Sequence, residues 1–317
     1  MASEQMDPLS IEAGGQGLLA ALNGQAPEAP PWFRAALAHP KEEVSISVQG
    51  VALHVLAWGD RGKPSLMLLH GNGAHARWWE FIAPFFAQDY RVVAPTWSGM
   101  GDSGWRASYG VDLCVAEALA AAEALGAFES RRKPLIVGHS FGGYPALALA
   151  ADHGNLWRGV ISVDSPVQHP GEKLGGPPAR HKPNRVYSTF EAILARFRLA
   201  PSQPCENLFA VDHIARHSIK PTDGGYTWKF DPFIWKDFKD RDSSSLLRAA
   251  RCPVAVMWGE ESKLMSRNTL MHMKRLLPSG APFTSVPSAD HHVMLDQPLA
   301  FVSALRGLLS AWPGETF

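Results

Sequence analysis

The clearest pattern along the chain is a series of short apolar runs separated by segments with helical periodicity. Residues 44–58 differ, because "VSISV" and "VALHVLAW" alternate apolar and polar positions around a Gln-Gly pair, which predicts a β-hairpin. Fully apolar strands that alternate with helices are typical of a buried parallel sheet. The other predicted strands are "SLMLLH", "RVVAP", "PLIVG", "GVISVD", "PVAVMWG" and "PFTSVP". The predicted helices lie near residues 78–87, 111–125, 141–152, 190–197, 268–277 and 299–309.

This alternation stops after Asp164 and resumes near residue 251. The intervening segment is rich in proline and aromatic residues and reads as irregular, with one predicted helix. A loop of this length in a compact domain usually forms a lid or a binding element. We therefore predict an N-terminal extension at 1–40 that lies outside the core, a core formed by 41–164 plus 251–317, and an inserted cap at 165–250.

Composition and charge narrow the class of partner. Thirty basic residues balance thirty acidic ones, so no overall field attracts nucleic acid or an anionic membrane, and a small-molecule substrate is expected. The three cysteines, Cys114, Cys205 and Cys252, form no CxxC pattern, which indicates neither a disulfide framework nor a zinc site. No basic-then-apolar leader and no run of about eighteen apolar residues is present, so a soluble cytoplasmic protein is expected. We expect no metal and no cofactor.

Ser140 stands between a predicted strand and a predicted helix, in "GHSFGG" at residues 138–143. This arrangement matches the G-x-S-x-G nucleophile elbow in its strand–turn–helix context. Its glycines allow a sharp turn that exposes a serine in a strained conformation. The alternative interpretation is a glycine-rich turn without chemistry.

A second motif, "HGNG" at residues 70–73, follows the predicted strand "SLMLL". A loop at this place supplies one backbone N–H of the oxyanion hole in proteins with a nucleophile elbow. We expect the backbone N–H groups of Asn72 and Phe141 to be the two donors. His70 is expected to brace the loop rather than to take part in catalysis.

These motifs, together with "RVVAPTWSGMGDS", "PVAVMWGEES" and "SADHHVMLDQP", resemble an α/β-hydrolase-fold enzyme from about Val44 to Leu309. The resemblance implies a mostly parallel eight-stranded sheet flanked by helices, with a cap inserted after strand 6. It is specific for the fold and says little about the substrate. Asp102, in the Gly-x-Gly-Asp-Ser-like run, is expected to tie a loop together.

The resemblance also implies a catalytic histidine in the last loop before the final helix. Counting back seven residues from Pro298 selects His291, and a slip of one residue in the alignment would select His292. No HExxH spacing accompanies the pair, so a metal site is not expected. His139 and His153 are interpreted as packing or surface residues.

The acid that would orient the histidine departs from the commonest family pattern, which would place an aspartate at Ser262. Asp164, at the end of the strand "GVISVD", is the favoured candidate, because some relatives carry their acid there. Glu261 and Glu260 are the alternatives. A carboxylate from either strand could reach the histidine, since a triad is defined by geometry rather than by sequence position.

Dehalogenases and epoxide hydrolases of this fold carry an aspartate where Ser140 stands, so the resemblance favours acyl chemistry. We expect hydrolysis of an ester or lactone of an apolar small molecule through an acyl-enzyme. Carbon–carbon bond hydrolysis and cofactor-free perhydrolysis stay open, as does an inactive, receptor-like binding protein. A homodimer formed through the N-terminal extension or the cap also stays open.

The substrate pocket is expected to lie between the oxyanion loop and the cap. The cap carries more aromatic side chains than an exposed loop tolerates, and an apolar pocket roof would use them, although many could simply pin the cap to the sheet. The pocket residues that we predict are Gly71, Gly73, Trp78, Trp228, Phe233 and Trp235.

Overall fold

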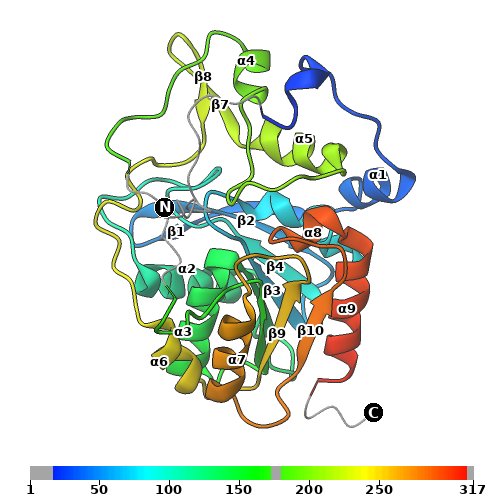
Figure 1. Cartoon of the computed structure of the whole chain (residues 1–317), viewed down its shortest axis with the longest axis vertical. Helices are drawn as coiled ribbons and strands as arrows, with labels where there is room; N and C mark the ends of the chain where they lie inside the picture. Colours follow the sequence, from blue (N-terminus) through cyan, green and yellow to red (C-terminus); the bar gives the residue numbers. More distant parts are fainter. Residues whose placement is uncertain (1–16, 173–179, 313–317) are drawn as a thin grey trace, which may run out of the picture.

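An eight-stranded sheet crosses the centre of the molecule in the order β1-β2-β4-β3-β5-β6-β9-β10 (Figure 1). The computed structural model describes residues 17–172 and 180–312. Strands β1, β2 and β4 pair antiparallel, and every other neighbouring pair in the sheet is parallel. The predicted fold class, a mostly parallel eight-stranded sheet, is confirmed. The strands are β1 (Glu42–Val48), β2 (Val51–Trp58), β3 (Ser65–Leu69), β4 (Arg91–Pro95), β5 (Leu135–His139), β6 (Gly159–Val163), β9 (Val254–Gly259) and β10 (Phe283–Val286).

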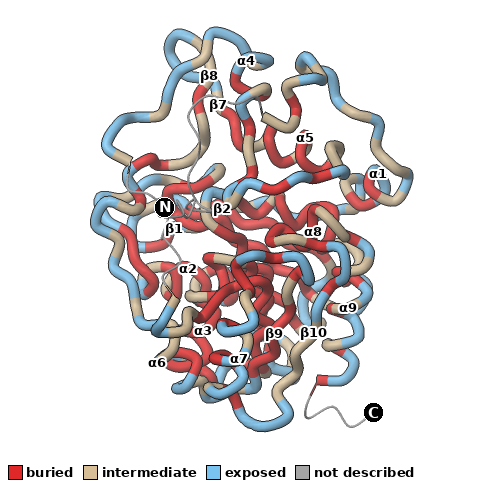
Figure 2. The backbone as a smooth tube through the Cα atoms, in the orientation of Figure 1, coloured by how far each residue is buried: buried red, intermediate tan, exposed pale blue. Residues whose placement is uncertain are grey.

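The sheet is apolar on both faces because helices cover both. In β3, Leu66 and Leu68 point into one hydrophobic cluster, and Met67 and Leu69 point into the other. This explains why the central strands read as fully apolar runs, and Figure 2 shows the buried residues concentrated along these strands. One face is covered by α2 (Val111–Ala124), α3 (Gly143–His153), α6 (Ser243–Arg248) and α7 (Arg267–Leu276). The other is covered by α8 (Val293–Asp296), α9 (Pro298–Ser310) and the 3₁₀ helices η2 (Ala76–Trp79) and η3 (Ala83–Phe85).

The single helix predicted near residues 78–87 is wrong, since the chain forms the two short 3₁₀ helices η2 and η3 there. Pro84 has no backbone N–H to donate to the preceding turn, so a continuous α-helix is not possible. Pro84 instead lies in the first turn of η3, where a missing N–H costs nothing. Within the described ranges, no helix is long and apolar enough to cross a membrane.

The segment between β6 and β9 is more regular than the sequence suggested. It contains α4 (Phe190–Leu194), α5 (Leu208–His217) and a hairpin of β7 (Ile219–Thr222) and β8 (Gly225–Trp228), which lie together above the sheet in Figure 1. The sequence interpretation missed α5, whose buried residues Ala210, Val211 and Ile214 follow a helical spacing. Helix α6 packs on α3 and α7 in the core, so we propose that the cap ends near residue 242 rather than 250.

The described part of the N-terminal extension, residues 17–40, does not lie outside the folded body as expected. Helix α1 (Pro31–Leu37) lies beside α5 in Figure 1, and Leu19 and Phe33 are buried in the cluster that also contains cap residues. The ring of Phe33 is 4.8 Å from that of Phe209 in α5 and 5.3 Å from that of Phe81. These contacts join the extension to both cap and core.

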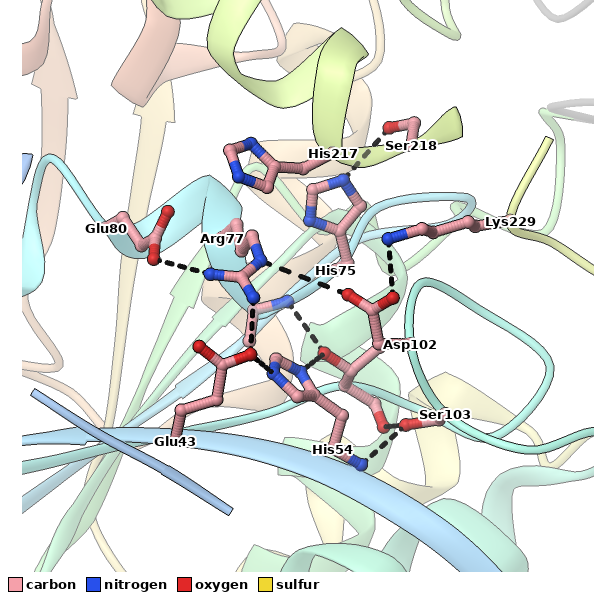
Figure 3. Close-up of polar contacts among 12 residues, drawn as sticks. Glu43, His54, His75, Arg77, Glu80, Asp102, Ser103, His217, Ser218 and Lys229 are labelled. Carbon is pink, nitrogen blue, oxygen red and sulfur yellow. Dashed lines mark hydrogen bonds and ion pairs between the residues drawn. The ribbon is translucent and has the colours of Figure 1, made fainter. Parts of the chain in front are cut away.

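Polar contacts connect the inserted segment to the core around η2 (Figure 3). Lys229 of the cap pairs with Asp102, and Arg77 reaches Asp102 at 3.9 Å, so Asp102 ties these segments together. Nε2 of His213 lies 2.7 Å from the carboxylate of Glu80. Burial opposes the charge on Glu80, but the His213 hydrogen bond and the nearby cations outweigh it and lower its pKa to about 2.

Replacement of Phe33 by alanine tests whether the extension belongs to the fold. Phe33 is 3% exposed, so Phe33→Ala should lower the free energy of unfolding by about 3–5 kcal/mol. Phe233 is 39% exposed, and Phe233→Ala serves as the matched control with a loss below about 1 kcal/mol. Urea unfolding followed by tryptophan fluorescence measures both. Equal losses in the two variants would show that α1 adds nothing to stability.

Candidate active site

Ser140 lies at the sharp turn between β5 and α3, within the 3₁₀ turn η4 (Ser140–Gly142). Its φ of 52° is in the left-handed region, which costs a non-glycine residue about 1–3 kcal/mol. Glycines make this turn possible: a Cβ on Gly138 would lie 2.5 Å from the carbonyl oxygen of Gly142, and a Cβ on Gly142 would lie 2.5 Å from that of Leu69. The G-x-S-x-G sequence therefore forms a nucleophile elbow.

A chain of hydrogen bonds connects Ser140, His291 and Asp164. Nε2 of His291 is 2.9 Å from Oγ of Ser140, and Nδ1 of His291 is 2.8 Å from Oδ1 of Asp164. Because an ionised carboxylate only accepts, this network assigns the proton of His291 to Nδ1 and leaves Nε2 to accept from the serine hydroxyl. The arrangement is that of a nucleophile, a base and an orienting acid.

The Asp164 carboxylate is fully buried and accepts two further hydrogen bonds. Oγ of Ser262 donates to Oδ1 at 2.7 Å, and the backbone N–H of Gly259 donates to Oδ2 at 2.9 Å. Ser262, which stands where the family's usual aspartate would be, thus supports the acid that arrives from β6. Glu260 and Glu261 are exposed, and neither of these described residues bonds to His291.

His292 lies beside the triad but makes no hydrogen bond to Ser140. Its ring packs 4.8 Å from that of His291 and 5.4 Å from that of Trp78, measured between ring centres. Burial holds the pKa of His292 well below its ordinary value, so the ring stays neutral. Its backbone N–H donates to Oε1 of Gln203, which lies in the segment inserted between β6 and β9. Of the two adjacent histidines, His291 therefore has the geometry of a base.

Several residues that the sequence interpretation did not assign to the site hold His291 in place. Nε2 of His139 donates to the carbonyl oxygen of His291 at 2.9 Å, so this residue of the elbow does more than pack. Asp296 accepts from the backbone N–H of Asp290 and from Nε2 of Gln203. Burial raises the pKa of Asp296 to about 6. Apart from the place of His139 in the elbow, no local motif marks these residues, because each acts through a partner about 90 or more positions away or through backbone atoms.

The oxyanion loop is braced by His70, as expected. Nδ1 of His70 donates to the carbonyl oxygen of Gly71, and Nε2 accepts the backbone N–H of Trp97 at 3.0 Å. Burial lowers the pKa of His70 to about 3, which keeps the ring neutral. A neutral ring can donate through Nδ1 and accept through Nε2 at the same time. Within the described ranges, the backbone N–H groups of Asn72 and Phe141 donate to no protein acceptor, so both are available to a ligand.

A cavity of about 1230 Å³ opens between the core and the cap, and Ser140 lies in its wall. The predicted pocket residues Gly73, Trp78, Trp228 and Trp235 line it, as do Asn72 and Phe141. Nε1 of Trp235 donates to Oδ1 of Asn72 at 3.2 Å, which joins the cap directly to the oxyanion loop.

Two predicted pocket residues are wrong. Gly71 does not line the cavity, because it packs against the elbow: a Cβ there would lie 3.1 Å from Cβ of Ser140. Phe233 is absent from the lining and is 39% exposed. The residues on either side of Phe233, Pro232 and Ile234, line the cavity instead.

Ring nitrogens of His139, His291 and His292 approach one another within 4.8 Å, a spacing that could hold a metal ion. Both ring nitrogens of His291 are hydrogen-bonded within the triad, and Nε2 of His139 is bonded to the His291 carbonyl. The existing bonds therefore account for the clustering of these rings. Glu80, His213 and His217 form a second such group on the far side of the oxyanion loop, where the Glu80–His213 pair connects core and cap.

The fold and this geometry define an α/β protein with a nucleophile elbow and a bonded serine, histidine and aspartate. The family model of the alpha/beta hydrolase family matches residues 66–305. The chain is 25% identical to esterase Rv0045c of Mycobacterium tuberculosis over 282 residues, which cover 83% of this chain and 88% of that protein. It is 32% identical to epoxide hydrolase 4 of Mus musculus over 130 residues, 40% of this chain and 34% of the relative.

Solved structures agree on the fold. The thioesterase domain from the curacin biosynthetic pathway superposes with a TM-score of 0.69 at 23% identity, covering 84% of this chain and 100% of that domain. This chain belongs to the alpha/beta hydrolase family. It is accordingly a hydrolase of that fold.

The neutral histidines around the triad predict loss of stability in acid. Burial lowers the pKa of His70 and of His139 to about 3, against an ordinary value of 6.5. Between pH 6.5 and 3 these histidines are protonated in the unfolded chain and neutral in the folded chain. The free energy of unfolding should therefore fall as the pH falls through this window. Each histidine contributes at most about 1.4 kcal/mol per pH unit.

Asp296 opposes this effect, because its pKa of about 6 lies above the ordinary 3.8 and the folded chain binds its proton first. Urea unfolding at pH 7.5, 6 and 5 should therefore show a falling midpoint, and Asp296→Asn should steepen the fall. A midpoint that is constant between pH 7.5 and 5 in both proteins would contradict the assignment of neutral buried histidines.

Proposed function

We propose that this protein is a serine hydrolase that cleaves an ester or lactone bond of a largely apolar small molecule through an acyl-enzyme. The observation that carries the proposal is the unbroken chain of hydrogen bonds from Asp164 through His291 to Oγ of Ser140. A serine with this activation attacks a carbonyl carbon.

In this mechanism Oγ of Ser140 attacks the carbonyl while Nε2 of His291 removes its proton. The Asp164 carboxylate holds the imidazole in the correct tautomer and stabilises its charged form. The N–H groups of Asn72 and Phe141 stabilise the negative oxygen of the tetrahedral intermediate. His291 then protonates the leaving alcohol, and a water activated by the same histidine releases the acid and restores Ser140.

The cavity supports a substrate with a sizeable apolar part. Its volume of about 1230 Å³ exceeds that of most small-molecule sites. Close to the elbow, the ring of Phe141 lies 5.4 Å from that of Trp235, which in turn lies 4.7 Å from that of Phe238. These rings form an apolar wall near Ser140, where an acyl chain or an alcohol group would be buried.

Variants of the triad test the mechanism. Ser140→Ala should abolish turnover and labelling by a fluorophosphonate probe, and Asp164→Asn should lower kcat by roughly 10⁴-fold with little change in KM. Glu261→Gln is the matched control for the acid, because its carboxylate is exposed and should leave kcat within twofold. His292→Ala should be much milder than His291→Ala.

The same assays distinguish other functions. Folded protein that is not labelled at Ser140 would indicate a ligand-binding protein rather than an enzyme. A collapse of kcat in Glu261→Gln together with a near-normal rate in Asp164→Asn would overturn the assignment of the acid.

A panel of p-nitrophenyl esters and lactones tests the substrate class. Each methylene that enters the apolar cavity should raise kcat/KM by about two- to fourfold until the space is filled. The comparison uses acyl chains from acetate to laurate at fixed pH and salt. A fall in kcat/KM from acetate onwards, with no lactone turned over, would contradict an apolar ester or lactone substrate.

A further inference from the structure

Charged side chains line the part of the cavity formed by the inserted segment. Five are arginines and four are carboxylates, so the wall is close to balanced in number. The arginines are Arg180, Arg185, Arg196, Arg198 and Arg241, and the carboxylates are Glu172, Asp231, Asp240 and Asp242. The two sets differ in their partners, because hydrogen bonds from neutral protein groups hold the carboxylates in place while they keep their negative charge.

Each carboxylate accepts hydrogen bonds from neutral groups of the protein, and none of these donors is an arginine side chain. Glu172 accepts from the side chains of Ser266, Asn268 and Thr269. The other three carboxylates accept hydrogen bonds mainly from backbone N–H groups. Asp231 accepts from the hydroxyl of Tyr109 and the N–H of Phe233. Asp240 accepts from the backbone N–H of Arg241, and Asp242 from that of Ser245. These acids hold loops and helix ends together.

Arg180 differs from these carboxylates, which all have hydrogen-bond partners. Its guanidinium makes no ion pair with any carboxylate in residues 17–172 or 180–312. Its central carbon lies 4.8 Å from the centre of the Phe230 ring, in a cation–π contact. The side chain is partly buried, and this burial lowers the pKa of Arg180. A partly desolvated cation with no partner anion among the described residues is costly, and a bound anion would offset that cost.

The ring beneath Arg180 is held in a fixed position. Nδ2 of Asn184 donates to the carbonyl oxygen of Phe230 at 2.6 Å, so the segment that carries Arg180 is bonded to the Phe230 loop. Phe230 forms a β-bridge with Met100, and the backbone N–H of Asp231 donates to Gly99 at 2.7 Å. The cation is thus mounted on a loop that is joined to the core. A site that is preorganised in this way loses little freedom when it binds a ligand.

Arg185 supplies a second cation on the same wall. Its guanidinium carbon lies 5.2 Å from the centre of the Tyr187 ring, in a second cation–π contact. Arg185 is exposed, whereas Arg180 is partly buried, so Arg185 lies nearer to solvent. An anion at Arg180 would therefore meet further positive charge on the solvent side.

We propose that the cavity contains an anion-binding subsite at Arg180, supported by Arg185, and that the substrate is an ester whose remote end carries a carboxylate or a phosphate. This inference rests on the proposed function and narrows its substrate class to amphipathic anions. The apolar body would occupy the aromatic wall near Ser140, and the anion would bind the edge of the guanidinium, which stacking on Phe230 leaves available. Arginine favours both groups, because its planar fork matches their paired oxygens.

The test compares charged and uncharged esters of equal length. The mono-p-nitrophenyl esters of adipic, suberic and sebacic acid carry a terminal carboxylate. In the matched uncharged substrates, the same p-nitrophenyl esters carry a methyl ester in place of that carboxylate. At the best length, the carboxylate should raise kcat/KM at least tenfold over the methyl ester, mostly through KM, since a charge-assisted hydrogen bond of this kind binds ground and transition states alike. Arg180→Gln should bring this ratio close to one, and Arg180→Lys should restore part of it.

Arg267→Gln is the matched control, because Arg267 is an exposed arginine at the start of α7 that does not line the cavity, and its ratio should equal that of the wild type. Melting temperatures of all variants show whether each has folded. A wild-type ratio near one at every length, or a ratio that survives in folded Arg180→Gln, would overturn the subsite.

Binding to Ser140→Ala separates this inference from the proposed chemistry. Calorimetric titration with suberate and with octyl phosphate should give saturable binding that weakens at least tenfold in Ser140→Ala/Arg180→Gln. Suberate binding tighter than octyl phosphate identifies a carboxylate substrate, and the reverse order identifies a phosphate. Absence of binding by both would overturn the subsite even if esters are hydrolysed. Binding without hydrolysis of any ester would leave the subsite standing and remove the proposed reaction.

Discussion

The site depends on the hydrogen bonds that satisfy the buried carboxylate of Asp164. A fully buried carboxylate is stable only if its oxygens are hydrogen-bonded, and here the donors come from three different segments: Gly259 at the end of β9, Ser262 in the following turn, and His291 in the loop before α8. Satisfying one charge therefore aligns the ends of two neighbouring strands with the histidine loop. The same bonds present Nε2 of His291 to Ser140.

A layer of neutral rings surrounds this charged centre. His70 holds the oxyanion loop, His139 bonds to the backbone of His291, and His292 packs between His291 and Trp78. His70 needs a neutral ring to accept from Trp97, and burial keeps all three rings neutral by lowering their pKa. Rigid positioning of the base is thus obtained at the expense of stability in acid.

The inserted segment is part of the site as well as a cover over it. Trp235 donates to the side chain of Asn72, and Gln203 bonds to both the histidine loop and Asp296, so the cap helps to set the geometry of the core residues. It also supplies most of the charged cavity wall.

Local sequence was sufficient to predict the features that neighbouring residues determine. The alternation of apolar runs and helices determined the sheet, the glycines around Ser140 determined the elbow, and Pro298 located His291 through the family resemblance. Tertiary structure decided among the candidate acids, because the carboxylate of Asp164 is buried beside His291 whereas Glu260 and Glu261 are exposed. It also decided the packing of α1 against α5, the roles of Ser262 and Gln203, and the solvent-facing position of Phe233. These depend on contacts between segments far apart in the chain, and such contacts leave no periodicity or spacing in the sequence that could have revealed them.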